Sequence, residues 1–147
     1  MNRVSDVMTR DVHTLSPADT LQRAAQLMDE LDVGVVPVSD GGELLGVVTD
    51  RDITVRGVAL NRPGNTTPLS EVMSAHAHCC YEDQTLVEVM QQMQDAQIRR
   101  LPVIDRGRRL VGIVSLGDLA IKSGTPDAEL AETLAVISDP ESSLAPH

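Results

Sequence analysis

Aromatic side chains are almost missing from this chain of 147 residues, which has no Trp, no Phe and a single Tyr. The hydrophobic core must therefore be aliphatic, and a binding site cannot rely on stacking a ligand ring against Trp or Phe. Cysteine is equally scarce. The only two, Cys79 and Cys80, are adjacent, a spacing that strains a mutual disulfide. The sequence excludes a disulfide scaffold and indicates a reducing compartment.

Basic residues are also few: 12 Lys and Arg stand against 22 Asp and Glu, for a formal net charge of −10. A globally acidic protein is repelled by nucleic acid and by anionic membranes, so we expect neither as a partner. A small phosphate ligand remains compatible, because nearby arginines act within a Debye length of about 8 Å. No apolar run approaches the ~20 residues of a membrane span, and the N-terminus lacks a signal-peptide apolar stretch. These absences predict a cytoplasmic protein.

What the sequence does contain is an internal repeat. A shift of 65 residues places SDVMT (5–9) on SEVMS (70–74) and Pro37-Val38 on Pro102-Val103. After one inserted residue, the stretch 46–52 aligns with 112–118. Two copies are too few for a solenoid, so we expect a pair related by a pseudo-twofold axis. The expected divisions are repeats at 1–62 and 70–123, a linker at 63–69, a C-terminal helix at 124–138 and a disordered tail at 139–147.

In each repeat, the residue pattern predicts an extended segment, a helix, a two-stranded hairpin and a second helix. The first helix follows Ser16-Pro17, with Ser16 or Asp19 as N-cap. Its counterpart follows the capping box formed by Thr85 and Glu88. The expected strands are 33–38, 44–48, 101–104 and 110–114, and a helix is expected from Asp50 to about Leu60. The expected apolar helix faces are Leu21, Ala24, Ala25, Met28 and Leu31 in the first repeat, and Leu86, Val89, Met90 and Met93 in the second.

Each repeat closes with the same corner, an apolar strand that ends in a hydroxyl residue with Asp three positions later. The pairs are Thr49 with Asp52 and Ser115 with Asp118. This spacing is typical of a helix N-cap with an acid in the first turn. It also suits a ribose site, because a carboxylate can accept hydrogen bonds from both hydroxyls of a diol. The spacing leaves both interpretations open.

The order and repetition of these motifs resemble a tandem pair of CBS domains, also called a Bateman module, over about residues 1–122. The resemblance implies a mixed α/β fold of two β-α-β-β-α repeats. It also implies pseudo-symmetric clefts between the repeats for adenosine derivatives such as AMP, ADP, ATP, NAD or S-adenosylmethionine. It assigns Thr49, Asp52, Ser115 and Asp118 to ribose and phosphate. The adenine pocket that it implies consists of Thr14, Val35, Val36, Pro37, Cys79, Leu101 and Pro102.

The two closing motifs differ in their arginines. Arg51 lies inside the first motif and Arg56 follows it, whereas the second motif has Leu116-Gly117 in place of Asp50-Arg51. Arg99-Arg100 aligns with the uncharged Gly34-Val35 of the first repeat. If a phosphate binds, we interpret Arg51, Arg56, Arg99 and Arg100 as its donors, because guanidinium matches phosphate geometry. The alternative is ordinary solvated surface charge.

Catalysis and metal binding find little support. His76, His78, Cys79 and Cys80 have suitable atoms for zinc, but their spacing matches no known closed site, so no metal is expected. No arrangement of a nucleophile with a base appears, and we expect neither an enzyme nor an obligatory cofactor. The sequence predicts a stand-alone regulatory or sensor module, a homodimer that acts on an unknown protein by population shift. The alternative is a dimeric adaptor that lacks a nucleotide and binds its partner through the C-terminal helix.

Overall fold

The computed structural model describes residues 2–75 and 78–122, which divide into two units. Residues 13–75 form what we call the first unit, and residues 2–12 with 78–122 form the second unit. The expected C-terminal helix (124–138) and tail (139–147) lie outside the described residues. None of the helices in residues 2–75 and 78–122 combines the length and the hydrophobicity that a membrane span requires.

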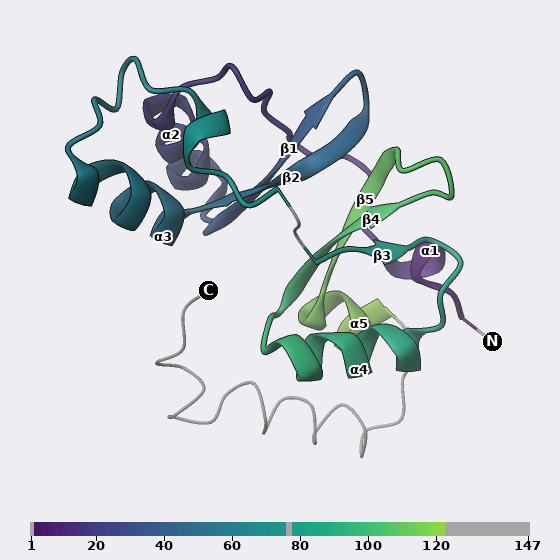
Figure 1. Cartoon of the computed structure of the whole chain (residues 1–147). Helices are drawn as coiled ribbons and strands as arrows, with labels where there is room; N and C mark the ends of the chain where they lie inside the picture. Colours follow the sequence, from purple (N-terminus) through teal and green to yellow (C-terminus); the bar gives the residue numbers. More distant parts are fainter. Residues whose placement is uncertain (1, 76–77, 123–147) are drawn as a thin grey trace. The chain divides into compact units, whose positions relative to one another are not determined.

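The first unit combines a helix, a hairpin and an irregular helical segment (Figure 1). Helix α2 (Leu21–Leu31) precedes the antiparallel strands β1 (Val35–Asp40) and β2 (Glu43–Thr49). The hairpin turns at Gly41 and Gly42, whose φ angles of 60° and 89° suit glycine. The helix expected from Asp50 to Leu60 is present but changes type twice. It runs as α3 (Asp50–Asp52), the π-helical η1 (Ile53–Gly57) and the 3₁₀ turn η2 (Val58–Leu60).

Helix α2 starts and packs differently from the expectation. Its N-cap is Thr20, whose Oγ1 accepts a hydrogen bond from the backbone N–H of Arg23 at 3.2 Å. The prediction of Ser16 or Asp19 as cap was wrong, because the Asp19 carboxylate accepts instead from the Ser16 N–H at 2.7 Å. Ala25 falls beyond the edge of the apolar stripe and Leu31 ends the helix, so these two residues of the predicted apolar face are exposed. The buried face is Leu21, Ala24, Leu27 and Met28.

The second unit contains a three-stranded sheet in the order β3 (Cys80–Tyr81), β4 (Arg100–Ile104), β5 (Leu110–Ser115). Strand β3 is parallel to β4, and β5 is antiparallel to it. Helices α4 (Leu86–Ala96) and α5 (Leu116–Lys122) complete the unit. The predicted capping box is confirmed: Glu88 N–H donates to Thr85 Oγ1 at 3.2 Å, and Thr85 N–H donates to Glu88 Oε1 at 3.0 Å. The predicted apolar face of α4 is buried as expected, at Leu86, Val89, Met90 and Met93.

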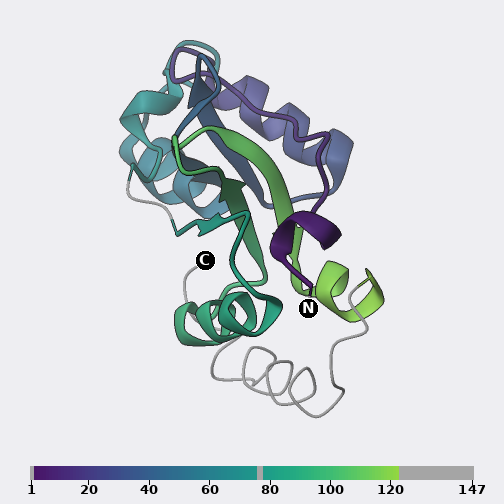
Figure 2. The ribbon, with the colours of Figure 1, turned by 90° about the vertical axis from the view of Figure 1, so that its right-hand side faces the viewer.

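The opening segments of the two repeats are exchanged between the units. Helix α1 (Val4–Val7) begins the first repeat, yet it packs on β5 and α5 of the second unit (Figures 1 and 2). Conversely, η3 (Leu69–Glu71) opens the second repeat, and its Leu69 lies in the core of the first unit. Each core therefore contains side chains from both repeats, so neither repeat can complete its core from its own residues.

The glycine of each closing motif lies where an exchanged segment meets a strand. Thr9 and Ile113 exchange two backbone hydrogen bonds of 2.8 and 2.9 Å, and Ser74 and Val47 exchange two of 2.9 and 3.1 Å. A Cβ added to Gly46 would collide with the carbonyl oxygen of Ser74. A Cβ on Gly112 would lie 2.8 Å from the carbonyl oxygen of Thr9. Only glycine lets the exchanged backbone approach this closely.

Candidate functional site

Both closing motifs form the same capped corner. Strand β2 ends at Thr49, whose N–H donates to Asp52 Oδ2 at 3.0 Å while its Oγ1 accepts from the Asp52 N–H at 3.0 Å. Strand β5 ends at Ser115, which makes the equivalent two hydrogen bonds with Asp118, both at 3.0 Å. The capping interpretation is therefore confirmed for both pairs. Each carboxylate is fixed in orientation by the chain itself.

Capping leaves capacity for a diol. A carboxylate has about four acceptor sites, and the cap hydrogen bond uses one of them. Among the described residues, nothing donates to Oδ1 of Asp52. The Asp52 and Thr49 side chains are nearly buried, each 9% exposed, whereas Ser115 and Asp118 are half-buried. A ribose diol at the first corner would thus meet a preoriented carboxylate in a partly dry environment, where a hydrogen bond to an ionised group is strong.

The residues after the two corners differ. In the first unit Asp50, Arg51, Thr54 and Val55 line a hollow of about 320 Å³. Within the described chain, the side chains of Arg51 and Arg56 have no hydrogen-bond or ion-pair partner, and both are exposed. Arg56 does not line the hollow. The first corner therefore has one charged hollow with a guanidinium available to a ligand.

The second corner receives its arginine from a neighbouring strand. Arg100 starts β4 and is the cross-strand partner of Ser115, just as Val35 is the partner of Thr49. The carbonyl of Arg99 accepts from the Leu116 N–H at 2.8 Å, matching the 3.0 Å hydrogen bond from Asp50 N–H to Gly34. The fold thus places Arg100 beside Ser115 in the sheet. The separation of the two residues along the chain does not by itself predict this pairing. Both arginines are exposed.

The predicted adenine-pocket residues come together in two equivalent groups. In the first unit Leu15 forms an isolated parallel β-bridge with Val38, so the segment containing Thr14 runs beside β1. In the second unit β3 pairs with β4, which brings Cys79 beside the strand of Leu101. The side chains of Val36 and Leu101 already lie in the cores, at 1% and 0% exposure, and Pro37 and Pro102 are buried too. A purine at these strands would therefore meet main-chain edges more than these side chains. The more accessible members are Thr14, Val35 and Cys79.

The two cysteine thiols lie in surroundings that disfavour their ionised form. Burial raises the pKa of Cys80 to about 12, with the neighbouring Cys79 adding to the effect. Burial also raises the pKa of Cys79, although Arg108 opposes it. A thiol with a raised pKa is protonated at neutral pH, while zinc binds the thiolate. Among the described residues, no three His, Cys, Asp or Glu side chains gather as a metal site; His76 lies outside that part of the chain.

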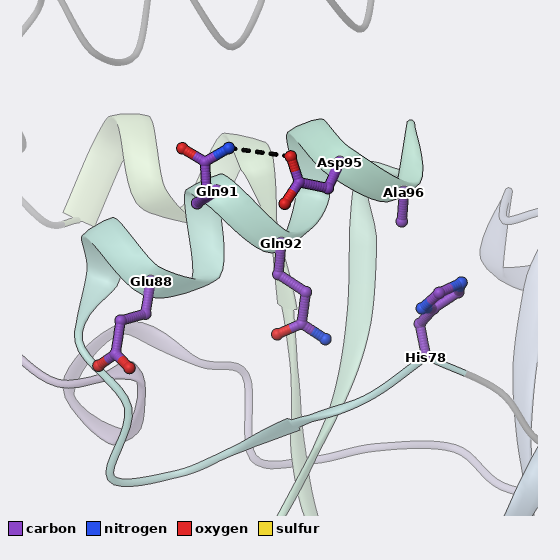
Figure 3. A pocket seen from close by; sticks show the side chains of 6 residues that line it. All are labelled: His78, Glu88, Gln91, Gln92, Asp95 and Ala96. Atoms are coloured by element: carbon purple, nitrogen blue, oxygen red, sulfur yellow. Dashed lines mark hydrogen bonds between the residues drawn. The ribbon is translucent and has the colours of Figure 1, made fainter.

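A second hollow, of about 310 Å³, lies along α4 and was missed by the sequence analysis. Figure 3 shows its side chains, with Gln91 donating to Asp95 at 2.9 Å. The only signal in the sequence is the spacing of polar residues on one side of α4. That spacing is typical of any solvated helix face. The lining residues are His78, Glu88, Gln91, Gln92, Asp95 and Ala96.

Comparison with known proteins decides the family. The family model of the CBS domain matches residues 4–56 and again residues 69–123. The chain belongs to the CBS-domain family. The predicted tandem CBS pair is therefore confirmed, and so is its mixed α and β fold of two repeats.

Several relatives share nearly the whole CBS pair. The CBS domain-containing protein YhcV of Bacillus subtilis is 48% identical over 121 residues, 82% of this chain and 85% of the relative. A crystal structure of Hypoxic Response Protein I with two coordinated zinc ions is 35% identical, with a TM-score of 0.74, covering 81% of this chain and 97% of that one. The CBS pair of protein MJ0100, in complex with 5′-methylthioadenosine and S-adenosyl-L-methionine, is 26% identical, with a TM-score of 0.70 and coverage of 82% and 94%.

Proposed function

We propose that this CBS pair is a non-enzymatic regulatory module that binds an adenosine-containing ligand at one or both capped corners. The observation that carries the proposal is the Asp52 carboxylate, which its own cap orients while Oδ1 has no partner in the described chain. A related CBS pair holds 5′-methylthioadenosine and S-adenosyl-L-methionine, which supports this class of ligand. The scarcity of aromatic residues is no obstacle, because an apolar slot with main-chain polar groups can hold a purine.

Regulation requires the ligand to prefer one of two conformations of the chain or of its assembly. A ligand shifts the equilibrium only by its difference in affinity for the two states. We propose that the chain forms a homodimer and that occupancy of the corners changes the geometry presented to a regulated protein.

Thermal unfolding with AMP, ADP, ATP, NAD and S-adenosylmethionine tests the proposal. A specific ligand at 100 times its Kd adds about 2.7 kcal/mol to the free energy of unfolding. Asp52→Asn and Asp118→Asn keep a capping oxygen but remove the charge, and the variant at the occupied corner should lose the shift. Glu88→Gln is the matched control, because Glu88 has the same capping role in α4 and belongs to neither corner.

The alternative, a dimeric adaptor without a nucleotide, predicts the opposite result. An adaptor would show no shift with any of the five compounds, and its dimer, measured by sedimentation, would be indifferent to them. Such a result would end the nucleotide proposal.

A further inference from the structure

The hollow beside the first corner contains two opposite charges that are not paired with each other. Asp50 and Arg51 both line it, and no ion pair joins their side chains. Among residues 2–75 and 78–122, only the backbone N–H of Arg51 donates to Asp50 Oδ1, at 2.8 Å. The Arg51 guanidinium has no partner in the described chain. Gly34 leaves room for the Asp50 carboxylate, since a Cβ there would lie 3.0 Å from Oδ2.

Adjacent, uncommitted charges of opposite sign suit a zwitterion. An α-amino acid group carries an ammonium and a carboxylate on one carbon, so it can satisfy Asp50 and Arg51 together with charge-assisted hydrogen bonds. A phosphate would be attracted by Arg51 but repelled by the Asp50 carboxylate that lines the same hollow. The hollow therefore favours a neutral zwitterion over a dianion.

The second corner cannot make the same distinction. Its equivalent positions are Leu116 and Gly117, which have no charge. Leu116 is buried in the core of the second unit. The two motifs therefore differ here: only the first places an acid and an arginine at these two positions.

From this, and resting on the proposed function, we infer that the first corner recognises adenosine ligands that carry an α-amino acid group. Asp50 binds the ammonium and Arg51 binds the carboxylate, while Asp52 accepts from the ribose hydroxyls. This assignment differs from the sequence-based interpretation of Arg51 as a phosphate donor, because only the structure shows Asp50 lining the same hollow.

Calorimetric titration of the full chain tests the inference with two probes. S-adenosylmethionine carries the amino acid group, and 5′-methylthioadenosine keeps the adenosine and sulfur without it. We expect S-adenosylmethionine to bind at least about tenfold more tightly, the range for a hydrogen bond to a charged group. S-adenosylhomocysteine, which lacks the sulfonium charge, should retain most of this advantage.

The variants Asp50→Asn and Arg51→Gln should each remove most of the advantage and leave the affinity for 5′-methylthioadenosine unchanged. Arg56→Gln is the matched control, an exposed arginine of the same helical segment that does not line the hollow. Asp50 and Arg51 are exposed, so the variants should keep the wild-type unfolding temperature, which is measured in parallel.

Four results would overturn the inference. The first is equal affinity of the wild type for the two probes, and the second is an advantage that survives both variants. In either case the proposed function stands if Asp52→Asn abolishes binding of both probes. The third is binding that only Asp118→Asn removes, which assigns the ligand to the second corner. If neither probe nor any nucleotide binds the wild type, the inference and the proposed function fail together.

Discussion

The two units build the same corner but continue it with different helices. After Thr49 the chain passes through α, π and 3₁₀ geometry within eleven residues, whereas after Ser115 it enters the regular helix α5. π-helical turns often occur at functional sites. The irregular segment is also the one with the charged hollow. The comparison indicates that the cap is shared structure and that the residues following it distinguish the two corners.

Deletion of residues 2–12 should produce the largest difference between the units. It removes Val4, Val7 and Met8 from the core of the second unit, each 0–7% exposed. Burying such side chains contributes about 1.5–3 kcal/mol each, so we expect a loss of about 5 kcal/mol or more. Hydrogen exchange should show deprotection of β4 and β5.

The matched variant is Leu69→Ala, which removes a buried side chain from the core of the first unit. It should deprotect β1 and β2 at a cost of about 2–5 kcal/mol. Equal deprotection of both units in both variants would contradict the assignment of each exchanged segment to the core of one unit.

Alanine at the two motif glycines should be the next largest change. Gly46→Ala and Gly112→Ala force a Cβ against the carbonyl oxygens of Ser74 and Thr9, and we expect each to cost up to about 3 kcal/mol in urea unfolding. Gly64→Ala is the control because nothing lies within 4 Å of its Cβ position. If Gly46→Ala is as mild as the control, the close approach of Ser74 is not a constraint.

Removal of the corner hydroxyls should have a smaller effect. Thr49→Ala and Ser115→Ala each lose an N-cap acceptor, which costs about 1 kcal/mol. We expect the larger loss at Thr49, because its surroundings are more buried and an unpaired N–H there finds less water. Thr49→Ser and Ser115→Thr retain the acceptor and should stay near the wild-type urea midpoint. A larger loss for Ser115→Ala would reverse this ranking of the corners.

The smallest expected difference between the units is in how the N-termini of helices α2 and α4 respond to pH. Hydrogen bonds from the Thr85 N–H, and then from its hydroxyl, lower the pKa of Glu88. A carboxyl group with a lowered pKa stabilises the fold above its unfolded pKa, near 4.3 for Glu, and loses this contribution as pH falls through the folded pKa. Helix α2 has Arg23 at the equivalent position, so acid should loosen the start of α4 and leave that of α2 unchanged.

Amide exchange at the first turns of α2 and α4, followed down to about pH 3, measures this difference. Glu88→Gln retains an acceptor without titrating and should remove the pH dependence of α4. Identical acid responses of α2 and α4 would contradict the assignment of the effect to Glu88.

Local spacing in the sequence was sufficient for much of the fold. Thr85 and Glu88 predict a capping box, and the apolar runs around Gly46 and Gly112 predict strands that end in capped corners. These features depend on residues within one or two turns of each other. The N-cap of α2 could not be predicted in this way, because Ser16, Asp19 and Thr20 are all residue types that cap helices. Only Thr20 directly precedes Leu21, the first buried residue of the helix.

The sequence by itself determined the repeat, the family and the two corner motifs, because each is written in contiguous residues. Tertiary structure decided that the opening segments are exchanged and that the motif glycines serve a close backbone approach. It also decided that Arg100 lies beside Ser115 and that Asp50 and Arg51 line one hollow without pairing. Most of these features join segments that are distant in the chain. All of them depend on where packing places the backbone and the side chains, and spacing along the sequence does not encode that placement.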